Sequence, residues 1–151
     1  MGKDIDLVIR LAAAADIPRL LALYKLLDIE PEPEMPLERA RARFSDLTSN
    51  DGHRIYVAEF EHQIVGTFAL IFIGGLSHDA RDSCIVEDVV VAPELQRAGI
   101  GKQMMHFAMQ RCAGGGCYKL VLSSHVDRSN AHRFYEGLGF RKHGYSYLID
   151  R

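Results

Sequence analysis

The stretch that decides the fold is residues 87–102, which read EDVVVAPELQRAGIGK. Its run of valines indicates a buried strand, and the glycines at 99 and 101 mark the start of a helix. The first turn of a helix has unpaired N–H groups and the positive end of the helix dipole. Glycine lets an anion approach the backbone, and Arg97 and Lys102 add positive charge. The pattern predicts a site for a phosphate or pyrophosphate.

Two common phosphate motifs do not fit this stretch. A P-loop requires Gly-x4-Gly-Lys-Ser/Thr, but Gln96 and Gln103 stand at its first and last positions. The dinucleotide-binding fingerprint requires a third glycine where Met104 stands, and no acidic ribose partner is evident. A Gly-x-Gly at a helix start is, by itself, equally typical of a tight turn.

The pattern of apolar residues predicts the elements on either side of this stretch. We expect helices over 17–27, with Asp16 as the N-cap, and over 37–47, 99–112 and 130–138. The expected strands are Leu7–Leu11, Arg54–Phe60, Ile64–Ile73, Cys84–Val91, Tyr118–Ser123 and Tyr145–Ile149. Antiparallel strands followed by strand–helix–strand units predict one domain of the α/β or α+β class.

Length and composition exclude several classes of protein. The 151 residues are 48% hydrophobic, which suits a compact core, and a net charge of −2 does not favour nucleic-acid binding. The longest uncharged stretch, 62–78, is too short and too rich in glycine to span a membrane, and acidic residues near Lys3 do not suit a signal peptide. We therefore expect a cytoplasmic protein that binds neither membrane nor nucleic acid.

The three cysteines are odd in number and form no CxxC pair. Cys84, Cys112 and Cys117 are therefore expected to be small buried side chains, and no metal site is predicted.

Two motifs together resemble a known family. Residues 96–101 (QRAGIG) match the Gln/Arg-x-x-Gly-x-Gly/Ala signature of the GNAT acetyltransferases, which use acetyl-CoA. Residues 130–140 (NAHRFYEGLGF) are similar to the family's segment with Asn, Phe-Tyr and Gly-Phe. The order of elements agrees from Leu7 to Ile149. The resemblance implies a single GNAT domain over 1–151, with a mixed, mostly antiparallel central sheet flanked by helices.

The resemblance also implies where acetyl-CoA binds. The pyrophosphate would lie on backbone amides of 97–102, and the pantetheine arm would pair with 89–91 like an extra strand. Asn130 would contact the pantetheine or its phosphate end, and Tyr135 would reach the thioester sulfur. The implied coenzyme-binding residues are Val89, Val90, Val91, Gln96, Arg97, Ala98, Gly99, Ile100, Gly101, Lys102, Asn130 and Tyr135.

The reaction requires a base and an acid. An amine must lose a proton before it attacks the acetyl carbonyl, and Glu87 or Asp88 would accept that proton directly or through water. Because neighbouring side chains of a regular strand point to opposite faces, at most one of the two faces the substrate. We prefer Glu87 as the base and Asp88 as a substrate or structural contact. A backbone N–H near Val89 or Val90 would stabilise the oxyanion, and Tyr135 would protonate the coenzyme A thiolate.

Each of these residues has a plainer interpretation. In that interpretation one carboxylate only pairs with a nearby arginine, and Tyr135 is a core residue of its helix. Asn130 is equally suited to be a helix N-cap.

The acceptor amine remains open at this stage. Segments 86–91 and 117–120 are similar to glucosamine-6-phosphate N-acetyltransferases, but Leu122-Ser123-Ser124 departs from the Leu-Asp-Cys of that subfamily. Amino sugars, aminoglycosides, polyamines, amino acids and protein amines are all candidate acceptors. An acidic loop favours a cationic acceptor by simple attraction, or is only solvated. Its carboxylates are Asp28, Glu30, Glu32 and Glu34.

Two further alternatives stay open. The chain could be a non-catalytic acyl-CoA-binding sensor, although such a protein needs neither Tyr135 nor Glu87. A homodimer is common in the family, and Tyr145, Tyr147 and Ile149 would supply its face unless they pack in the chain's own sheet.

Overall fold

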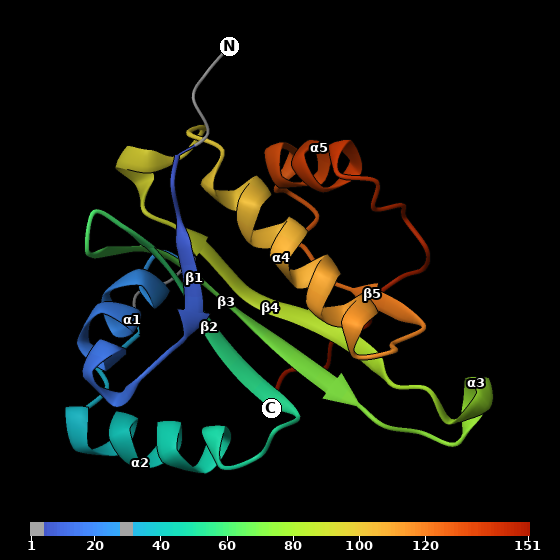
Figure 1. Ribbon diagram of the computed structural model, residues 1–151, viewed down its shortest axis with the longest axis horizontal. Coiled ribbons are helices and arrows are strands. Elements are labelled where there is room, and N and C mark those ends of the chain that lie inside the picture. The colour runs from blue at the N-terminus through green and yellow to red at the C-terminus, as the bar shows by residue number, and fades with distance from the viewer. Residues whose placement is uncertain (1–4, 28–31) are drawn as a thin grey trace. The chain divides into compact units, whose positions relative to one another are not determined.

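A computed structural model describes residues 5–27 and 32–151, and the chain divides into two compact units, one ending at Val121 and the other beginning at Leu122. The first unit contains a five-stranded sheet in the order β1-β2-β3-β4-β5 (Figure 1). The first four strands pair antiparallel and β5 is parallel to β4, which confirms the mixed, mostly antiparallel sheet. The strands are β1 Val8–Leu11, β2 His53–Phe60, β3 Gln63–Ile73, β4 Ser83–Val91 and β5 Lys119–Val121.

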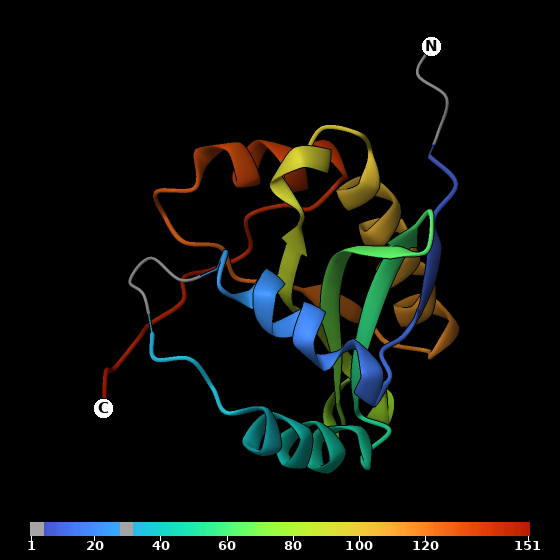
Figure 2. The ribbon, with the colours of Figure 1, turned by 90° about the vertical axis from the view of Figure 1, so that its left-hand side faces the viewer.

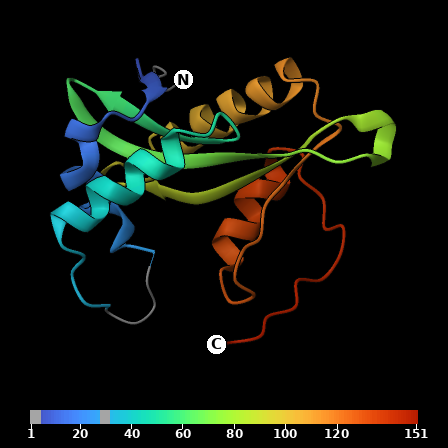
Figure 3. The same ribbon diagram turned by 90° about the horizontal axis from the view of Figure 1, so that it is seen from below.

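Helices cover both faces of this sheet. Helices α1 (Ile17–Tyr24) and α2 (Leu37–Thr48) pack on one face, and α4 (Ile100–Gly114) packs on the other (Figure 2). A 3-10 turn, η1 (Ala14–Asp16), leads into α1. Strands β3 and β4 run on to a short turn, α3 (Ser77–Ala80), which the sequence did not predict (Figure 3). Helix α1 is shorter than expected, because residues 25–27 form turns instead of a last helical turn.

Alternation along β2 separates the two halves of the core. Ile55 and Val57 pack with Leu20 of α1, whereas Tyr56 stacks on Phe68, with ring centroids 5.2 Å apart. Phe107 of α4 meets the Tyr56 ring edge-on at 5.1 Å. Strand alternation therefore directs one set of side chains to α1 and α2 and the other to α4.

Asp16 lies at the predicted N-cap position, but its side chain does not make the hydrogen bond expected of an N-cap. It is the N-cap of α1, yet its carboxylate accepts from the Ala13 N–H at 2.7 Å and pairs with Arg10 at 2.7 Å. The Arg10 guanidinium holds the pKa of the Asp16 carboxyl below its usual range, and Arg10 also pairs with Glu59 of β2. These ion pairs fasten β1 to the start of α1.

Helix α4 ends in a Schellman motif that brings cysteines together. Gly116 has a φ of +72°, its N–H donates to Ala113, and the Cys117 N–H donates to the Cys112 carbonyl at 3.1 Å. This geometry places the side chains before and after the turn side by side. Burial raises the pKa of Cys84 to about 11 and that of Cys112 to about 12, and these thiols interact with each other and with Cys117.

Cys84 and Cys112 are buried as expected, while Cys117 is only half-buried. No group of three or more His, Cys, Asp or Glu side chains in the described residues is arranged to hold a metal ion. Nor is any helix in those residues long and apolar enough to cross a membrane.

The second unit contains α5 (Ser129–Gly137) and an irregular C-terminal segment. The predicted strand Tyr145–Ile149 is wrong, because no described residue of this segment pairs as a strand. Its apolar side chains are instead exposed, with Tyr145 91% and Tyr147 92% accessible. The backbone of a strand needs hydrogen bonds to a neighbouring strand. The hydrogen bond between the Ser146 and Ser123 side chains does not provide them. The predicted strand Tyr118–Ser123 is also shorter than expected, since β5 spans only Lys119–Val121.

Candidate active site

A β-bulge in β4 positions the two candidate carboxylates. Glu87 lies opposite Ala69 and Val90 lies opposite Thr67, so β4 has one more residue than β3 between these pairs. Asp88 occupies the bulge with a φ of +53°, a conformation that Asp tolerates better than most residues. The expectation of regular alternation is therefore wrong here. Both Glu87 and Asp88 are exposed as residues, although the surrounding protein partly desolvates their carboxyl groups.

The electrostatics of this pair favour a proton acceptor. Burial, followed by the charge of Asp88, raises the pKa of Glu87. Burial also raises the pKa of Asp88, while the His53 imidazole acts in the opposite direction. An arginine partner would lower a carboxyl pKa, so the raised values are not those expected of a simple ion pair. A carboxylate with a raised pKa is a better general base.

The open edge of β4 lies directly beyond the bulge. Strand β5 pairs only with Ser83–Ile85, and no strand in the described residues pairs with Val86–Val91 on that side. The predicted pantetheine-contacting residues 89–91 fall in this unpaired part. Backbone groups left unpaired in this way are suited to receive an extended ligand as an additional strand.

A tight turn joins this edge to α4. The 3-10 turn η2 (Pro93–Leu95) comes first, and Arg97 and Gly99 then adopt φ values of +69° and +83°. The Gln96 side-chain amide donates to the Val91 carbonyl at 3.3 Å, which ties the turn to the end of the strand.

The start of α4 offers free backbone donors. The first helical bond runs from the Gln103 N–H to the Gly99 carbonyl, and the N–H groups of Ile100, Gly101 and Lys102 have no backbone acceptor in the described residues. The Ala98 N–H differs from the expectation, because it already donates to Leu95 at 3.3 Å. The remaining donors, with the positive end of the helix dipole, suit a pyrophosphate.

The second unit contains the other two predicted residues, both on α5. Asn130 lies inside the first turn and accepts a hydrogen bond from Arg133, so the alternative role as N-cap is wrong; Arg128 stands at that position. Tyr135 packs against the rings of Phe134 and Phe140, with centroids 5.1 and 5.8 Å away. Burial raises the pKa of Tyr135, so its phenol keeps its proton at neutral pH.

Two residues of the first unit were not recognised as site residues in the sequence. Tyr24, at the end of α1, was counted only among apolar helix positions, and Thr67 was not singled out within the apolar run 64–73. Burial, followed by the charge of Asp88, raises the pKa of Tyr24, while Thr67 acts in the opposite direction. The available signal was a single threonine within the apolar run of β3, whose residues 65–70 are buried.

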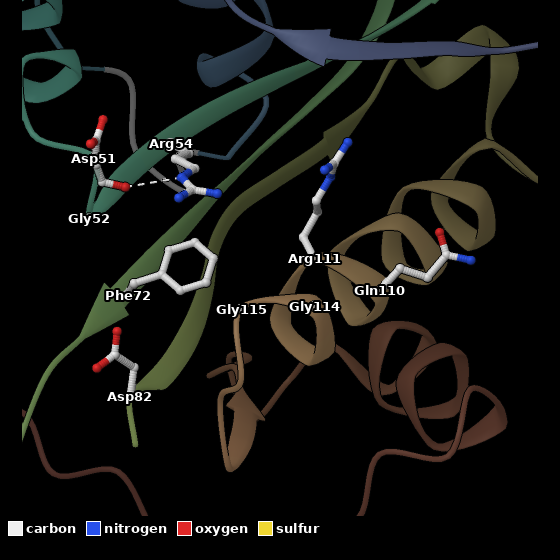
Figure 4. A pocket seen from close by; sticks show the side chains of 9 residues that line it. All are labelled: Asp51, Gly52, Arg54, Phe72, Asp82, Gln110, Arg111, Gly114 and Gly115. Carbon is white, nitrogen blue, oxygen red and sulfur yellow. Dashed lines mark hydrogen bonds between the residues drawn. The ribbon is translucent and has the colours of Figure 1, made fainter. Parts of the chain in front are cut away.

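A hollow of about 530 Å³ lies elsewhere in the first unit, between the start of β2 and the end of α4 (Figure 4). Arg54 stacks over the Phe72 ring at 4.7 Å there, and its Nε donates to the Asp51 carbonyl. None of the predicted site residues lines this hollow.

The acidic loop is only partly described. Asp28 and Glu30 lie outside the described residues. Glu34 is exposed and pairs with Lys25 at 3.0 Å, which fits a solvated loop at that position.

Comparison with known proteins identifies the family. The profile of the Acetyltransferase (GNAT) family matches residues 18–140. The chain is 31% identical to a glucosamine 6-phosphate N-acetyltransferase of Trypanosoma brucei brucei over 99% of both chains. It is 24% identical to the PanD regulatory factor of Escherichia coli (strain K12), over 80% of this chain and 91% of that protein.

A solved structure agrees with these sequence matches. It is that of an Agrobacterium tumefaciens protein described as a putative acetyltransferase, with a TM-score of 0.90 and 29% identity over 95% of this chain and 99% of that one. The chain therefore belongs to the GNAT acetyltransferase family and is an acyltransferase.

Proposed function

We propose that the chain transfers the acetyl group of acetyl-CoA directly to a primary amine of a small molecule. One observation carries the proposal: the unpaired edge of β4 lies between exposed carboxylates at the bulge and free N–H groups at the start of α4. A thioester held along such an edge would have a base at one end and an anion site at the other. The family's general use of acetyl-CoA supports the same assignment.

The residues have complementary roles in this reaction. Glu87 takes one proton from the ammonium form of the acceptor, so that the nitrogen lone pair is free to attack the acetyl carbon. A backbone N–H near Val89 or Val90 stabilises the oxyanion as the carbon–nitrogen bond forms. When the carbon–sulfur bond breaks, Tyr135 gives its proton to the thiolate. The nitrogen loses its second proton as the tetrahedral intermediate collapses, and solvent returns a proton to the Tyr135 phenolate, so the reaction balances without a covalent enzyme intermediate.

Tyr135 is suited to be the acid because its phenol carries a proton at neutral pH. Burial keeps the phenol protonated until the thiolate forms. The family profile matches residues 18–140, a range that includes both Glu87 and Tyr135. Asn130 remains proposed as a contact of the coenzyme.

Glucosamine 6-phosphate is the first acceptor to test. A relative of that name matches almost the whole chain at 31% identity. The segment Leu122-Ser123-Ser124, which follows β5, departs from that subfamily, so other amino sugars, aminoglycosides, polyamines and amino acids belong in the same panel.

The test is thiol release from acetyl-CoA across this panel of amines. The Tyr135→Phe variant should lower kcat by about a hundredfold or more, because a general acid contributes at least that factor. Tyr145→Phe is the matched control: Tyr145 lies in the same unit with 91% of its surface exposed, and the change should leave kcat as it is.

The second candidate function is a non-catalytic acyl-CoA sensor, which the similarity to a protein named as a regulatory factor favours. It predicts acetyl-CoA binding without amine-dependent thiol release. That result would overturn the proposed transfer reaction.

The compartment and the assembly are also part of the proposal. We place the enzyme in the cytoplasm as a homodimer, and the exposed Tyr145, Tyr147, Leu148 and Ile149 support a contact between copies. Sedimentation of the purified chain would distinguish the dimer from a monomer.

A further inference from the structure

The hollow between the start of β2 and the end of α4, which we call the β2–α4 hollow, has the features of a second binding site. Its volume of about 530 Å³ is in the range of small-molecule sites. All of its lining residues lie in the first unit, and none belongs to the proposed acetyl-transfer site. A ligand in this hollow would therefore not occupy the place of acetyl-CoA or of the acceptor amine.

Two arginines line the hollow from different elements (Figure 4). The guanidinium carbon of Arg54, on β2, lies 4.7 Å from the centre of the Phe72 ring. That of Arg111, on α4, lies 4.7 Å from the centre of the Phe107 ring. Apart from the bond between the Arg54 Nε and the Asp51 carbonyl, neither guanidinium group donates to a residue that the structure describes. A ring covers one face of a guanidinium group and leaves the N–H donors in its plane free, which suits a carboxylate.

Two carboxylates line the same hollow. Asp51 lies just before β2 and Asp82 just before β4, and the Tyr118 N–H donates to the Asp82 carbonyl at 3.0 Å, which holds that backbone in place. Neither carboxylate is in an ion pair with a basic side chain in the described part of the chain. Helix α4 ends at Gly114, which also lines the hollow, so the negative end of the helix dipole lies there too. The hollow thus contains charges of both signs that do not neutralise one another by direct contact.

Gly115 keeps part of the hollow open. Its φ of −81° and ψ of 0° are accessible to other residues, so the backbone does not require glycine at this position. An added Cβ would lie 3.3 Å from the Phe72 ring and 3.3 Å from the Arg111 carbonyl oxygen. The space beside the Phe72 ring therefore exists because position 115 has no side chain, and an apolar group of a ligand could occupy it.

We propose that the β2–α4 hollow binds an α-amino acid. The carboxylate of the ligand accepts N–H bonds from Arg54 and Arg111, its ammonium group donates to Asp82, and an apolar side chain lies against Phe72. The two aspartates and the end of α4 would repel a plain anion, and the two arginines would repel a plain cation. A ligand with one charge of each sign satisfies both groups. The inference goes beyond acetyl transfer and does not depend on it.

The experiment is a calorimetric titration of the full chain, without acetyl-CoA, with L-leucine as the probe. Two molecules with the same carbon skeleton each lack one charge: L-leucinamide lacks the carboxylate, and 4-methylpentanoate lacks the ammonium group. A mildly acidic buffer keeps the amine of leucinamide protonated. We expect each of the two to bind about tenfold more weakly than leucine, the loss expected for one hydrogen bond at a charged group.

Variants test whether leucine binds in the hollow. Arg54→Gln should weaken leucine binding about tenfold and remove the preference over leucinamide, and Asp82→Asn should remove the preference over 4-methylpentanoate. Arg111→Gln should have the same effect as Arg54→Gln, and its side chain is exposed, so the change does not disturb the core. Arg39→Gln is the matched control, because Arg39 lies exposed on α2 and does not line the hollow.

Amino acids are also candidate acceptors, so Glu87→Gln distinguishes the hollow from the proposed acceptor site. Leucine binding that is unchanged in Glu87→Gln and weakened in Arg54→Gln and Arg111→Gln supports the inference. No binding by the wild type, equal binding of all three molecules, or binding that only Glu87→Gln weakens would overturn it. A wild type that binds leucine in the hollow but releases no thiol with any amine would overturn the proposed function alone.

Discussion

Glu87 and Asp88 occupy adjacent positions in β4, and each has a pKa raised mainly by burial. A carboxyl whose pKa is higher in the folded chain than in the unfolded chain stabilises the fold only while it is protonated. That contribution is complete below the unfolded pKa and is lost as the pH rises through the folded pKa. At neutral pH the ionised pair therefore lowers the free energy of unfolding. The rest of the fold compensates for this cost, and the two carboxylates stay available at the proposed site.

Asp88→Asn should accordingly raise the thermal unfolding temperature at neutral pH. Asn carries no charge and tolerates the positive φ of the bulge as well as Asp does. The gain should vanish in acid, below the ordinary Asp pKa, where the wild-type carboxyl is protonated in both states. Unfolding temperatures across this pH range test the prediction.

Asp46→Asn is the matched control for this change, since Asp46 lies exposed on α2. It should leave the unfolding temperature nearly the same. A lower unfolding temperature for Asp88→Asn at neutral pH would show that the Asp88 charge stabilises the bulge instead.

The β4–turn–α4 element was the most predictable part of the chain. Its valine run, its glycines and the GNAT signature were sufficient to predict both a strand and a helix. The bulge was not predictable, because no residue type marks the position where β4 gains a residue over β3. The effect of Asp88 on Tyr24 was not predictable for a related reason: a tyrosine on an apolar helix face gives no sign of the charges near it.

Gly99→Ala should destabilise this element by about 1 kcal/mol, the cost of placing a side chain in the left-handed region. The φ of Gly99 is +83°, and an added Cβ would meet no atom within 4 Å, so the cost is conformational and not steric. Urea unfolding measures the free energy.

Gly114→Ala is the control at the other end of α4. Gly114 is the last helical residue, and its Cβ would also meet open space. Alanine favours the helix there, so the free energy of unfolding should stay the same or rise slightly. Equal losses in the two variants would contradict the role given to the Gly99 conformation.

At the scale of the whole chain, the sequence predicted the fold class but not the C-terminal segment. Strands that pair with a neighbour in the first unit, such as β2 and β3, lie close to their predicted bounds. Tyr145–Ile149 has the same alternation without a partner strand, and the pattern alone did not make it a strand. The predicted coenzyme and catalytic residues stay predictions until ligand binding and turnover are measured.

Acetyl-CoA should raise the unfolding temperature of the full chain, and the shift should grow with its concentration. A ligand at a hundred times its Kd stabilises a folded chain by about 2.7 kcal/mol. An adenine nucleotide without the pantetheine arm should give a clearly smaller shift, because it leaves the β4 edge unpaired. Thermal shifts with both ligands test this, and equal shifts would indicate a plain nucleotide site.

The unpaired edge of β4 has a consequence for handling as well as for catalysis. A strand edge with free N–H and C=O groups accepts any extended backbone, and that of another copy competes with the coenzyme for the same hydrogen bonds. Occupancy by the coenzyme would then protect the chain from edge-to-edge aggregation. The chain should therefore aggregate less, in storage and in crowded solution, when acetyl-CoA is present.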